Sequence, residues 1–425
     1  GKPMAEKLAE GRPEAAYLLE RLVDIAALEL KMDPVELRRK NFIPKEEFPY
    51  QTPVAFLYAS GDYHKLFDTV LQKADYAGMR KAQEEARKKG KLVGVGVSGC
   101  IEASGPAPSQ VAGSLGSAVG FWESAVLRTH PTGKVTLLTG SHTHGQGHET
   151  TFAQIVADEL GISMDDVEIV HGDTARVPFG MGSYGSRSTS VGGSAIVNSA
   201  KKIRAKALKL AAHLLEAAEE DMVYDQDTGK VHVKGSPDKA KAFGELAFAA
   251  YTAHNMPAGM EPGLEESAFY DPANFTFPNS AHIAQVEIDR DTGEVTIQRY
   301  VAVDDVGKVI NPLIVDGQIV GGVVQGVGQA LWEHGVYDDN GQLLSANFME
   351  YAMPHADKFP TIETARIETP SPHNPLGVKG AGEMGTIAST PTIANAVMDA
   401  LAPLGIKHLD MPLTPEKIWR AMNKK

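Results

Sequence analysis

Four glycine-rich segments constrain the fold of this chain more than any other feature. They span residues 140–151, 180–194, 311–331 and 375–389, and the whole chain contains 42 glycines in 425 residues. Because glycine lacks a Cβ, a glycine-rich backbone can turn sharply and approach another group closely. We therefore expect a protein that wraps its backbone around a bound molecule.

The residues before these segments predict a helical beginning. Residues 13–31 have helical periodicity, and Asp33 followed by Pro34 is typical of a helix that starts with an Asp N-cap. Residues 63–90 read as one more amphipathic, highly charged helical region. We expect residues 1–90 to form a mainly helical segment.

After residue 90 the pattern changes to strands mixed with helices. Strands are predicted near 93–99, 123–130, 134–140, 167–172, 221–225, 230–235, 281–289 and 294–305, and helices near 148–160, 194–219, 319–332, 391–402 and from 415 onward. A strand–strand–helix order occurs twice, near 92–160 and 281–332. This predicts an α+β fold with two related mixed α/β lobes, residues 91–275 and 276–425, after the helical N-terminal segment.

Composition and charge exclude several functional classes. Lys and Arg total 41 against 54 Asp and Glu, a formal net charge of −13. A surface this acidic repels phosphate backbones, so we expect no nucleic-acid partner. No apolar run reaches the roughly 18 to 20 residues that a membrane-spanning helix needs, so we expect no such helix.

The cysteine content limits the metal chemistry of the side chains. Cys100 is the single cysteine. It cannot form an intramolecular disulfide, nor alone ligate an iron–sulfur cluster or a structural zinc. We expect a buried, unreactive thiol, and the scarcity of cysteine fits a reducing, cytoplasmic location.

The first glycine-rich segment, residues 140–151, contains His142, His144 and His148. His144 and His148 could share a face of one helical turn and bind zinc. However, Gly145 and Gly147 favour a loop that leads into a helix, and such a loop binds anions through free backbone N–H groups. We favour the anion-binding loop over a plain turn, and a plain turn over a metal site.

The second segment, residues 180–194, combines glycines with many Ser and Thr hydroxyls and Arg187. Such a run offers many hydrogen-bond donors and a close backbone, as a phosphate-bearing cofactor requires. A flexible linker is the alternative. We consider the linker less favoured, because linkers rarely carry residues such as Tyr184 and Arg187 between a strand and a long helix.

The remaining two segments each allow two interpretations. In residues 375–389, Glu383 is a carboxylate in a glycine-rich, mostly apolar loop and could act as a general base near neutral pH. Alternatively Lys379 pairs with it, or the glutamate simply begins a helix at a surface turn. In residues 311–331, glycines would expose a helix backbone, with Gln325 and Gln329 on one face, for tight helix packing or for cofactor contact.

Taken together, these segments resemble one family, the molybdenum-cofactor subunits of the xanthine oxidase family of molybdenum hydroxylases. The resemblance rests on GQGHETTFAQIVADELGI (145–162), GSYGSRST (182–189), QGVGQAL (325–331) and GVKGAGE (377–383), in this order and spacing. It extends over nearly the whole chain from Gly11. The texture is most similar to large subunits of the carbon monoxide dehydrogenase type, including RRKNFIPKEEFPY (38–50) and SPHNPLGVKGAGE (371–383).

The resemblance implies a molybdopterin cofactor whose dithiolene sulfurs hold molybdenum, so that no side chain need be a metal ligand. In bacterial relatives the cofactor is usually the cytosine dinucleotide form. The resemblance implies that Glu383 is the catalytic base that deprotonates a molybdenum-bound hydroxide, which attacks an electron-poor carbon while water supplies the oxygen. The implied cofactor-binding residues are Gln146, Gly147, His148, Ser183, Tyr184, Gly185, Ser186, Arg187, Ser188, Thr189, Lys379, Gly380 and Gly382.

The resemblance also implies partners and a domain organisation. Residues 1–90 would be the helical tail of a first molybdenum-cofactor-binding domain, and residues 91–425 a second one. Family members usually carry a preceding half with another glycine-rich loop, which we expect here on a second molybdenum-domain chain unless the sequence is a fragment. Electrons from an aldehyde or N-heteroaromatic substrate would pass to an iron–sulfur (FeS) subunit and an FAD subunit. Carbon monoxide dehydrogenases have an Arg-Cys pair where this chain has Met4 to Glu10, so carbon monoxide oxidation is unsupported.

Overall fold

A four-stranded sheet organises the larger part of the structure, a computed structural model that describes residues 11–53, 56–114 and 116–424. The strand order is β13–β12–β11–β3. β11 pairs antiparallel with both β3 and β12, whereas β13 pairs parallel with β12. The strands are β3 (Leu92–Ile101), β11 (Asn279–Ile288), β12 (Val295–Asp305) and β13 (Ile362–Ile367).

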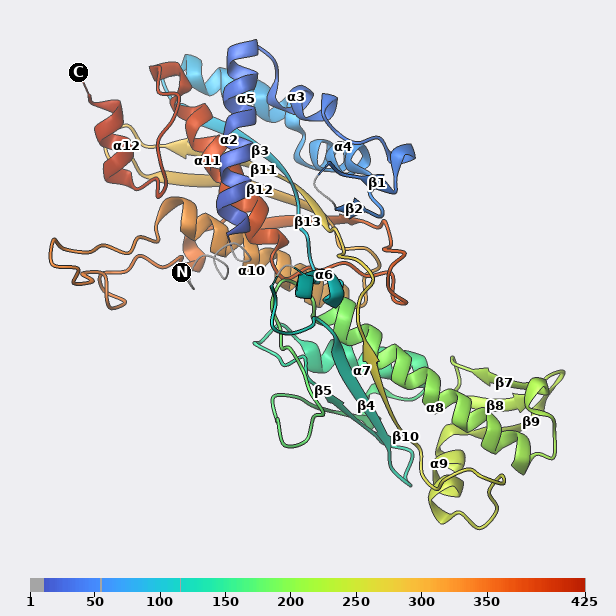
Figure 1. Cartoon of the computed structure of the whole chain (residues 1–425). Helices are drawn as coiled ribbons and strands as arrows, with labels where there is room; N and C mark the ends of the chain where they lie inside the picture. Colours follow the sequence, from blue (N-terminus) through green and yellow to red (C-terminus); the bar gives the residue numbers. More distant parts are fainter. Residues whose placement is uncertain (1–10, 54–55, 115, 425) are drawn as a thin grey trace.

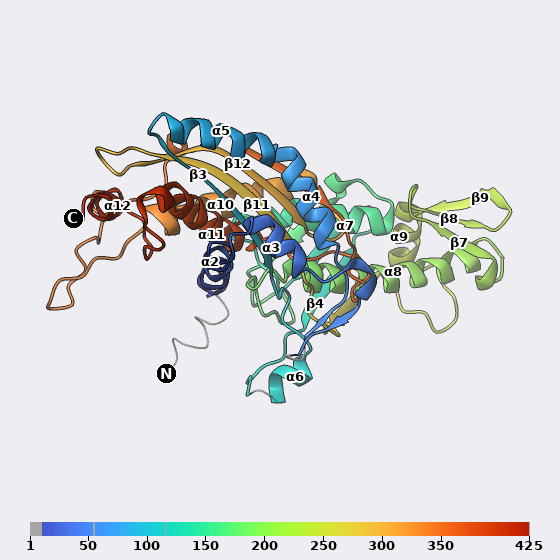
Figure 2. The same cartoon turned by 90° about the horizontal axis from the view of Figure 1, so that it is seen from above.

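Helices bury both faces of this sheet (Figures 1 and 2). Alternate residues of β12 point to opposite sides, as the period of a strand requires. Tyr300 and Ala302 join the apolar cluster with α10 (Pro312–Leu331) and α11 (Met384–Leu401). Val301 and Val303 join the cluster with α4 (Tyr63–Ala74). Because both faces are covered, the strands are apolar over most of their length.

A second sheet, with order β10–β4–β5–β6, forms the other lobe. β4 pairs antiparallel with β10 and β5, and β6 pairs parallel with β5. Two helices bury one face of it in a core that includes Leu127, Leu137, Phe152 and Ile196. The elements are β4 (Glu123–Thr129), β5 (Val135–Thr139), β6 (Val167–Val170), β10 (Glu265–Tyr270), α7 (His148–Leu160) and α8 (Gly193–Leu214).

The two lobes have the same topology, which confirms the prediction of related α+β lobes. In each, an antiparallel hairpin is followed by a helix and by a strand parallel to the second hairpin strand. The expected boundaries, 91–275 and 276–425, differ from the strand pairing at one place: β3 belongs to the sheet of β11 to β13. Because β3 is the strand before β4 in the sequence, the sequence order places it in the lobe of β4. In the structure β3 pairs instead with β11: Ile101 lies opposite Asn279, 178 residues later in the chain, and Leu92 lies opposite Ile288.

The remaining elements are peripheral. A three-stranded sheet of β7, β8 and β9 lies with α9 at the far end of α8 (Figure 1). The predicted hairpin around 226–229 joins β7 to β8 and is confirmed. No helix of the described residues is long and apolar enough to span a bilayer. The bounds are α2 (Arg12–Leu30), α3 (Pro34–Lys40), β1 (Tyr50–Gln51), β2 (Leu57–Tyr58), α5 (Tyr76–Lys88), α6 (Ser109–Ser114), β7 (Met222–Asp225), β8 (Lys230–Val233), β9 (Ser236–Ala242), α9 (Phe243–Thr252) and α12 (Pro415–Met422).

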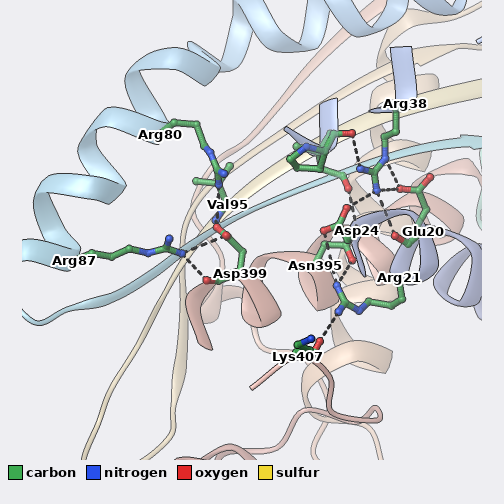
Figure 3. Close-up of polar contacts among 12 residues, drawn as sticks. Glu20, Arg21, Asp24, Arg38, Arg80, Arg87, Val95, Asn395, Asp399 and Lys407 are labelled. Atoms are coloured by element: carbon green, nitrogen blue, oxygen red, sulfur yellow. Dashed lines mark hydrogen bonds and ion pairs between the residues drawn. The ribbon is translucent and has the colours of Figure 1, made fainter. Parts of the chain in front are cut away.

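Polar contacts attach the N-terminal helices to α11 and to β3 (Figure 3). On α2, Arg21 donates 2.8 Å to Asn395 Oδ1. On α5, Arg80 and Arg87 bind the carboxylate of Asp399 at 3.1 and 3.3 Å. Asp399 also accepts the backbone N–H of Val95 at 2.8 Å. The Arg21 contact attaches α2 to α11, and the Asp399 contacts attach α5 and β3 to the same helix.

Several helix bounds differ from the sequence prediction. The region 63–90 is two helices, α4 and α5, because Asp75 between them is left-handed with φ of 48°. α8 ends at Leu214, five residues before the predicted end at Glu219. α10 begins at Pro312, seven residues before the predicted start at 319.

The start of α11 is the difference that matters most for the site, because this helix begins directly after Glu383. It was expected to begin near Pro391, but it begins at Met384 with Pro391 inside it. The error came from reading proline as a helix start, a common but not obligatory position. The extended loop that precedes α11 therefore ends at Glu383, which is the N-cap residue.

Candidate functional site

A cavity of about 1030 Å³ lies between the two lobes. Segments that lead into four helices line it: residues 144–148 before α7, 183–189 before α8, 306–311 before α10 and 378–383 before α11. Helix N-termini present free backbone N–H groups and a positive dipole end. The cavity is therefore suited to a ligand that carries negative charge.

The loop before α7 places Gln146 and His148, two of the implied cofactor-binding residues, at the cavity. His148 is buried and stacks on Phe152 with ring centroids 4.8 Å apart. Burial, more than any neighbouring charge, lowers the pKa of His148 to about 4, so its imidazole is neutral near neutral pH. Its Nδ1 is buried and has no hydrogen-bond partner among the described residues, and it is therefore available to a ligand.

Gly147 does not itself line the cavity, but it shapes the loop. Its φ is +76°, and a Cβ there would lie 2.5 Å from Ile314 Cδ1.

The alternative of a zinc site in this loop is not supported, because no three His, Cys, Asp or Glu residues in the described part of the chain are placed to hold a metal.

The loop before α8 contributes every predicted residue from Ser183 to Thr189 to the cavity wall. Ser183 donates 2.5 Å to the His142 carbonyl and shares a 2.7 Å hydrogen bond with the hydroxyl of Ser188. The first bond connects this loop with the loop before α7, and the second lies within the loop before α8. The two first-lobe loops therefore form one continuous wall rich in hydroxyls and backbone N–H groups.

Arg187 anchors this loop rather than offering its charge to the cavity. Its side chain is fully buried, and its Nη1 lies 3.2 Å from Oε2 of Glu123, which is also fully buried. Nη1 also donates 2.8 Å to the Gly182 carbonyl, and Nη2 donates to the carbonyls of Phe121 and Trp122 at 2.9 and 3.1 Å. Its guanidinium therefore binds the protein itself.

Lys379 has the corresponding anchoring role in the loop before α11. Its Nζ donates 2.9 Å to Asp305 Oδ2 at the end of β12, and 2.7 Å to Thr369 Oγ1. Burial lowers the pKa of Lys379, and the charge of Asp305 opposes this effect. Lys379 thus pairs with Asp305 and not with Glu383, the pairing that the sequence left open.

Gly380 and Gly382, also implied cofactor-binding residues, line the cavity. A Cβ on Gly380 would lie 2.5 Å from Ser186 Cβ and 2.6 Å from Ser186 O. The glycine therefore lets the loop before α11 touch the loop before α8, and this contact closes the cavity on one side.

Glu383 lies at the cavity in polar surroundings. Its Oε2 accepts 3.0 Å hydrogen bonds from Arg12 Nη1 and from the Ser186 hydroxyl. Its side chain is 29% exposed. The expected apolar surroundings are wrong, because Arg12 at the start of α2 and Ser186 of the other lobe reach this carboxylate across the fold.

Arg12 and Glu102 are site residues that the sequence reasoning missed. Glu102 follows β3 directly and is fully buried, and its Oε1 lies 3.0 Å from Arg12 Nη1. Arg12 therefore bridges Glu102 and Glu383. The available signal was a single acidic residue after a long apolar strand, but its nearness to Glu383 depends on a contact across 281 positions of sequence that no local pattern predicts.

Gly322 and Gly326 of α10 serve helix packing, the first of the two alternatives left open. A Cβ on Gly322 would lie 2.9 Å from Gly385 Cα, so α10 and α11 approach backbone to backbone. Gln329 accepts 2.9 Å from Thr390 Oγ1. Neither Gln325 nor Gln329 lines the cavity, whereas Gln318 of the same helix does.

Comparison with known proteins identifies a family with this arrangement. Two models described as molybdopterin cofactor-binding domains match residues 69–360 and 9–42. The carbon monoxide dehydrogenase large chain of Hydrogenophaga pseudoflava is 45% identical over 415 residues, which cover 97% of this chain and 51% of that relative. The nicotine 6-hydroxylase large subunit of Paenarthrobacter nicotinovorans is 37% identical, covering 99% of this chain and 51% of that relative.

A solved structure extends the likeness to three dimensions. A copper- and molybdenum-containing carbon monoxide dehydrogenase superposes with a TM-score of 0.91 at 42% identity, covering 97% of this chain and 52% of that one. The chain thus spans about half the length of the relatives it matches. On these grounds the chain belongs to the molybdopterin cofactor-binding domain family, among the molybdenum-cofactor-binding subunits of the xanthine oxidase family and similar to carbon monoxide dehydrogenase large chains.

Proposed function

We propose that this chain supplies the molybdopterin-binding and catalytic residues of a hetero-oligomeric molybdenum hydroxylase. The reaction would oxidise a C–H bond of an aldehyde or an N-heteroaromatic ring, with water as the oxygen source. The observation that carries the proposal is the placement of Glu383 in a cavity walled by glycine-rich loops of both lobes. The nicotine hydroxylase relative supports the heteroaromatic alternative.

The residues around the cavity fit a phosphate-bearing pterin. The backbone N–H groups at the helix N-termini and the hydroxyl of Thr189 can donate to phosphate oxygens. His148 Nδ1 is a buried polar atom without a partner among the described residues, as expected of a group that a cofactor satisfies. The exposed Lys308 side chain adds a positive charge to the wall. We infer that the cofactor is the cytosine dinucleotide form.

The cofactor and the side chains around it would have separate roles. When bound, the molybdenum cofactor would supply oxygen-atom transfer and accept two electrons from the substrate. Glu383 would accept a proton at a carboxylate oxygen from the attacking group, since a positioned carboxylate can serve as a general base. Ser186 and Arg12 hold that carboxylate in place through their 3.0 Å hydrogen bonds. The first-lobe loops would bind and orient the cofactor.

The surface of α2 supports a partner that completes the site. Five leucines of this helix are half or more exposed, at 50 to 63%. A leucine-rich exposed helix face typically contacts another polypeptide. We infer that it packs against the rest of the first molybdenum-cofactor-binding domain, and that iron–sulfur and FAD subunits receive the electrons. The leucines are Leu18, Leu19, Leu22, Leu28 and Leu30.

Carbon monoxide oxidation is a second candidate, favoured by the 45% identity to a carbon monoxide dehydrogenase large chain. Cys100, the only cysteine, is buried behind α11, where its thiol donates 3.8 Å to the Ile387 carbonyl. It does not line the cavity. The segment from Met4 to Glu10, where such enzymes have an Arg-Cys pair, lies outside the described residues. This candidate would therefore need a cysteine from outside the given sequence.

The test is a substrate panel applied to the assembled enzyme and to its Glu383→Gln variant. Aldehydes, N-heteroaromatic compounds and carbon monoxide are offered in ¹⁸O-labelled water, and labelled product and electron release are measured. The proposal predicts labelled hydroxylated product, with turnover reduced about 100- to 10,000-fold in Glu383→Gln. Glu363→Gln, which removes a surface carboxylate paired with Arg299, is the matched control and should retain turnover. Intact hydroxylation by Glu383→Gln would disprove the catalytic assignment, and no turnover of any substrate would favour a non-catalytic chain.

A further inference from the structure

Glu102 is a buried carboxyl that the proposed chemistry does not yet use. Its side chain is fully buried at the end of β3. Its Oε1 accepts 3.0 Å from Arg12 Nη1, whereas Oε2 is buried without a hydrogen-bond donor among the described residues. An ionised carboxylate normally accepts several hydrogen bonds when buried, so this oxygen requires an explanation.

Arg12 holds Glu102 and Glu383 beside each other. The same nitrogen, Nη1, lies 3.0 Å from Glu102 Oε1 and 3.0 Å from Glu383 Oε2. Its other nitrogen, Nη2, donates 2.9 Å to the Ala103 carbonyl and so fixes the orientation of the guanidinium. One positive charge therefore serves two carboxyl groups. A second negative charge on this pair would have no cation of its own.

Both carboxyl groups lie against the same guanidinium nitrogen of Arg12, so a proton on one of them would allow a hydrogen bond between them. Ionised carboxylates only accept hydrogen bonds, so a bond between two of them requires a proton on one. Burial decides which group holds it. Glu102 is fully buried, whereas the Glu383 side chain is 29% exposed and also accepts from Ser186. The charged form costs more at the buried site, so the proton belongs on Glu102.

The pKa of Glu102 agrees with this geometry. Burial first, and the negative charge of Glu383 next, raise the pKa of Glu102 to about 8. Arg12 and the Ser186 hydroxyl act in the opposite direction and lower it. Glu102 is thus protonated near neutral pH and ionises as the pH rises through about 8.

We propose that Glu102 is a positioning residue that donates its carboxyl proton to Glu383 and thereby holds the Glu383 carboxylate toward the cavity. This inference rests on the proposed function, in which Glu383 is the general base. While Glu102 is neutral, Glu383 carries the only negative charge of the pair and Arg12 compensates it. When Glu102 ionises, it loses its proton donor role and repels Glu383, so the base is no longer held in one orientation.

The first readout does not depend on turnover. Infrared difference spectra of the purified, assembled protein are recorded across a pH titration, for wild type and for Glu102→Gln. We expect a carbonyl band of a protonated carboxylic acid that persists at neutral pH, disappears with an apparent pKa near 8 and is absent from Glu102→Gln. Arg12→Gln should move the disappearance to higher pH, because it removes the cation that lowers the pKa of Glu102. A wild-type protein without this band at neutral pH would overturn the proposal.

The second readout is the pH profile of turnover. Wild type should lose kcat as the pH rises through about 8. Glu102→Val, which cannot donate, should lower kcat about 10- to 100-fold with little change in KM, the loss expected for one charge-assisted hydrogen bond. Glu102→Gln, which keeps a donor, should recover most of this loss and lack the alkaline fall. Profiles with the wild-type alkaline fall in both variants would overturn the positioning role.

These outcomes separate the two claims. If Glu383→Gln is fully active, the proposed general base is wrong, and the infrared titration still decides where the proton lies. If Glu383→Gln is inactive while Glu102→Val has wild-type kcat and the wild-type pH profile, the general base stands and Glu102 has no positioning role.

Discussion

The two lobes contain the same succession of elements, yet they contribute different chemistry to the cavity between them. β4, β5, α7, β6 and α8 of one lobe correspond in order and pairing to β11, β12, α10, β13 and α11 of the other. In the first lobe the loops before the helices offer serine hydroxyls and backbone N–H groups. In the second they offer Glu383. One topology thus provides both a wall rich in backbone N–H groups and a carboxylate that faces it.

In each lobe an ion pair anchors one glycine-rich loop, the loop before α8 or the loop before α11. In each, a buried cation from the loop binds a buried carboxylate on a strand: Arg187 with Glu123 of β4, and Lys379 with Asp305 of β12. In both lobes the cation of the glycine-rich motif therefore anchors its own loop to a strand. The charge that faces Glu383 comes instead from α2, through Arg12.

The largest expected effect is the loss of the first-lobe anchor. Arg187→Met leaves Glu123 buried without its cation and removes three hydrogen bonds to carbonyls. Removing one partner of a buried ion pair costs about 3 to 5 kcal/mol of unfolding free energy. Denaturant unfolding measures the loss, with Arg128→Met of an exposed pair with Glu265 as control. A loss no larger than that of the control would contradict the anchoring role.

The second-lobe anchor should be weaker. Lys379→Met leaves Asp305 buried, but Asp305 still accepts the backbone N–H groups of Gly307 and Thr369 at 3.0 Å. Burial also lowers the pKa of Lys379, so the folded protein disfavours its charged form. We expect a loss of about 2 to 3 kcal/mol in the same unfolding measurement. If this loss exceeds that of Arg187→Met, the ranking of the two anchors is wrong.

The contact between the loop before α8 and the loop before α11 should leave no room for an added Cβ. Gly380→Ala would place Cβ 2.6 Å from the Ser186 backbone oxygen, so one loop must move. We expect a loss of about 1 to 3 kcal/mol, and weaker binding of the cofactor because the wall is opened. Gly317→Ala is the matched control, since a Cβ there meets no atom within 4 Å. Equal stability of the two variants would show that the loops do not meet closely.

The last expected effect, no larger than that of Gly380→Ala, is a pH dependence in the first lobe. The pKa of His148 is lowered from 6.5 to about 4, so between these values the unfolded state binds more protons than the folded state. The unfolding free energy therefore falls as the pH falls from 6.5 to about 4, by roughly 1 to 3 kcal/mol at the lower end. His148→Gln should lack this part of the acid destabilisation, which unfolding at stepped pH measures. Parallel curves for both proteins would disprove the assignment.

Local signals in the sequence predicted much of the fold. The strand runs, the helix that begins at His148 and the hairpin at 226–229 all depend on neighbouring residues, and the structure has them. The strand partner of β3 depends on chain closure over a long separation, so the order of elements assigned β3 to the wrong sheet. The predicted starts of α10 and α11 lie too far along the sequence. Asn311 followed by Pro312 was not recognised as the start of α10, and Pro391, which lies inside α11, was taken as its start.

The sequence motifs identified residues that lie together, although their roles stay predictions. The glycine-rich motifs are local, and all but Gly147 of the catalytic and cofactor-binding residues that the resemblance implies line one cavity. The direction of a charged side chain is set by its tertiary partner, so Arg187 and Lys379 could not be recognised as anchors. Glu102 and Arg12 were missed for the same reason, since each acquires its role only beside Glu383.

The central claim is that this cavity holds a molybdenum cofactor. The most direct measurement is molybdenum per chain, by elemental mass spectrometry, in protein purified from its native source with its co-purifying chains identified. We predict near-stoichiometric molybdenum, cytidine nucleotide released on hydrolysis, and a second molybdenum-domain polypeptide in the same sample. Protein that lacks molybdenum although all co-purifying chains are retained would contradict the claim.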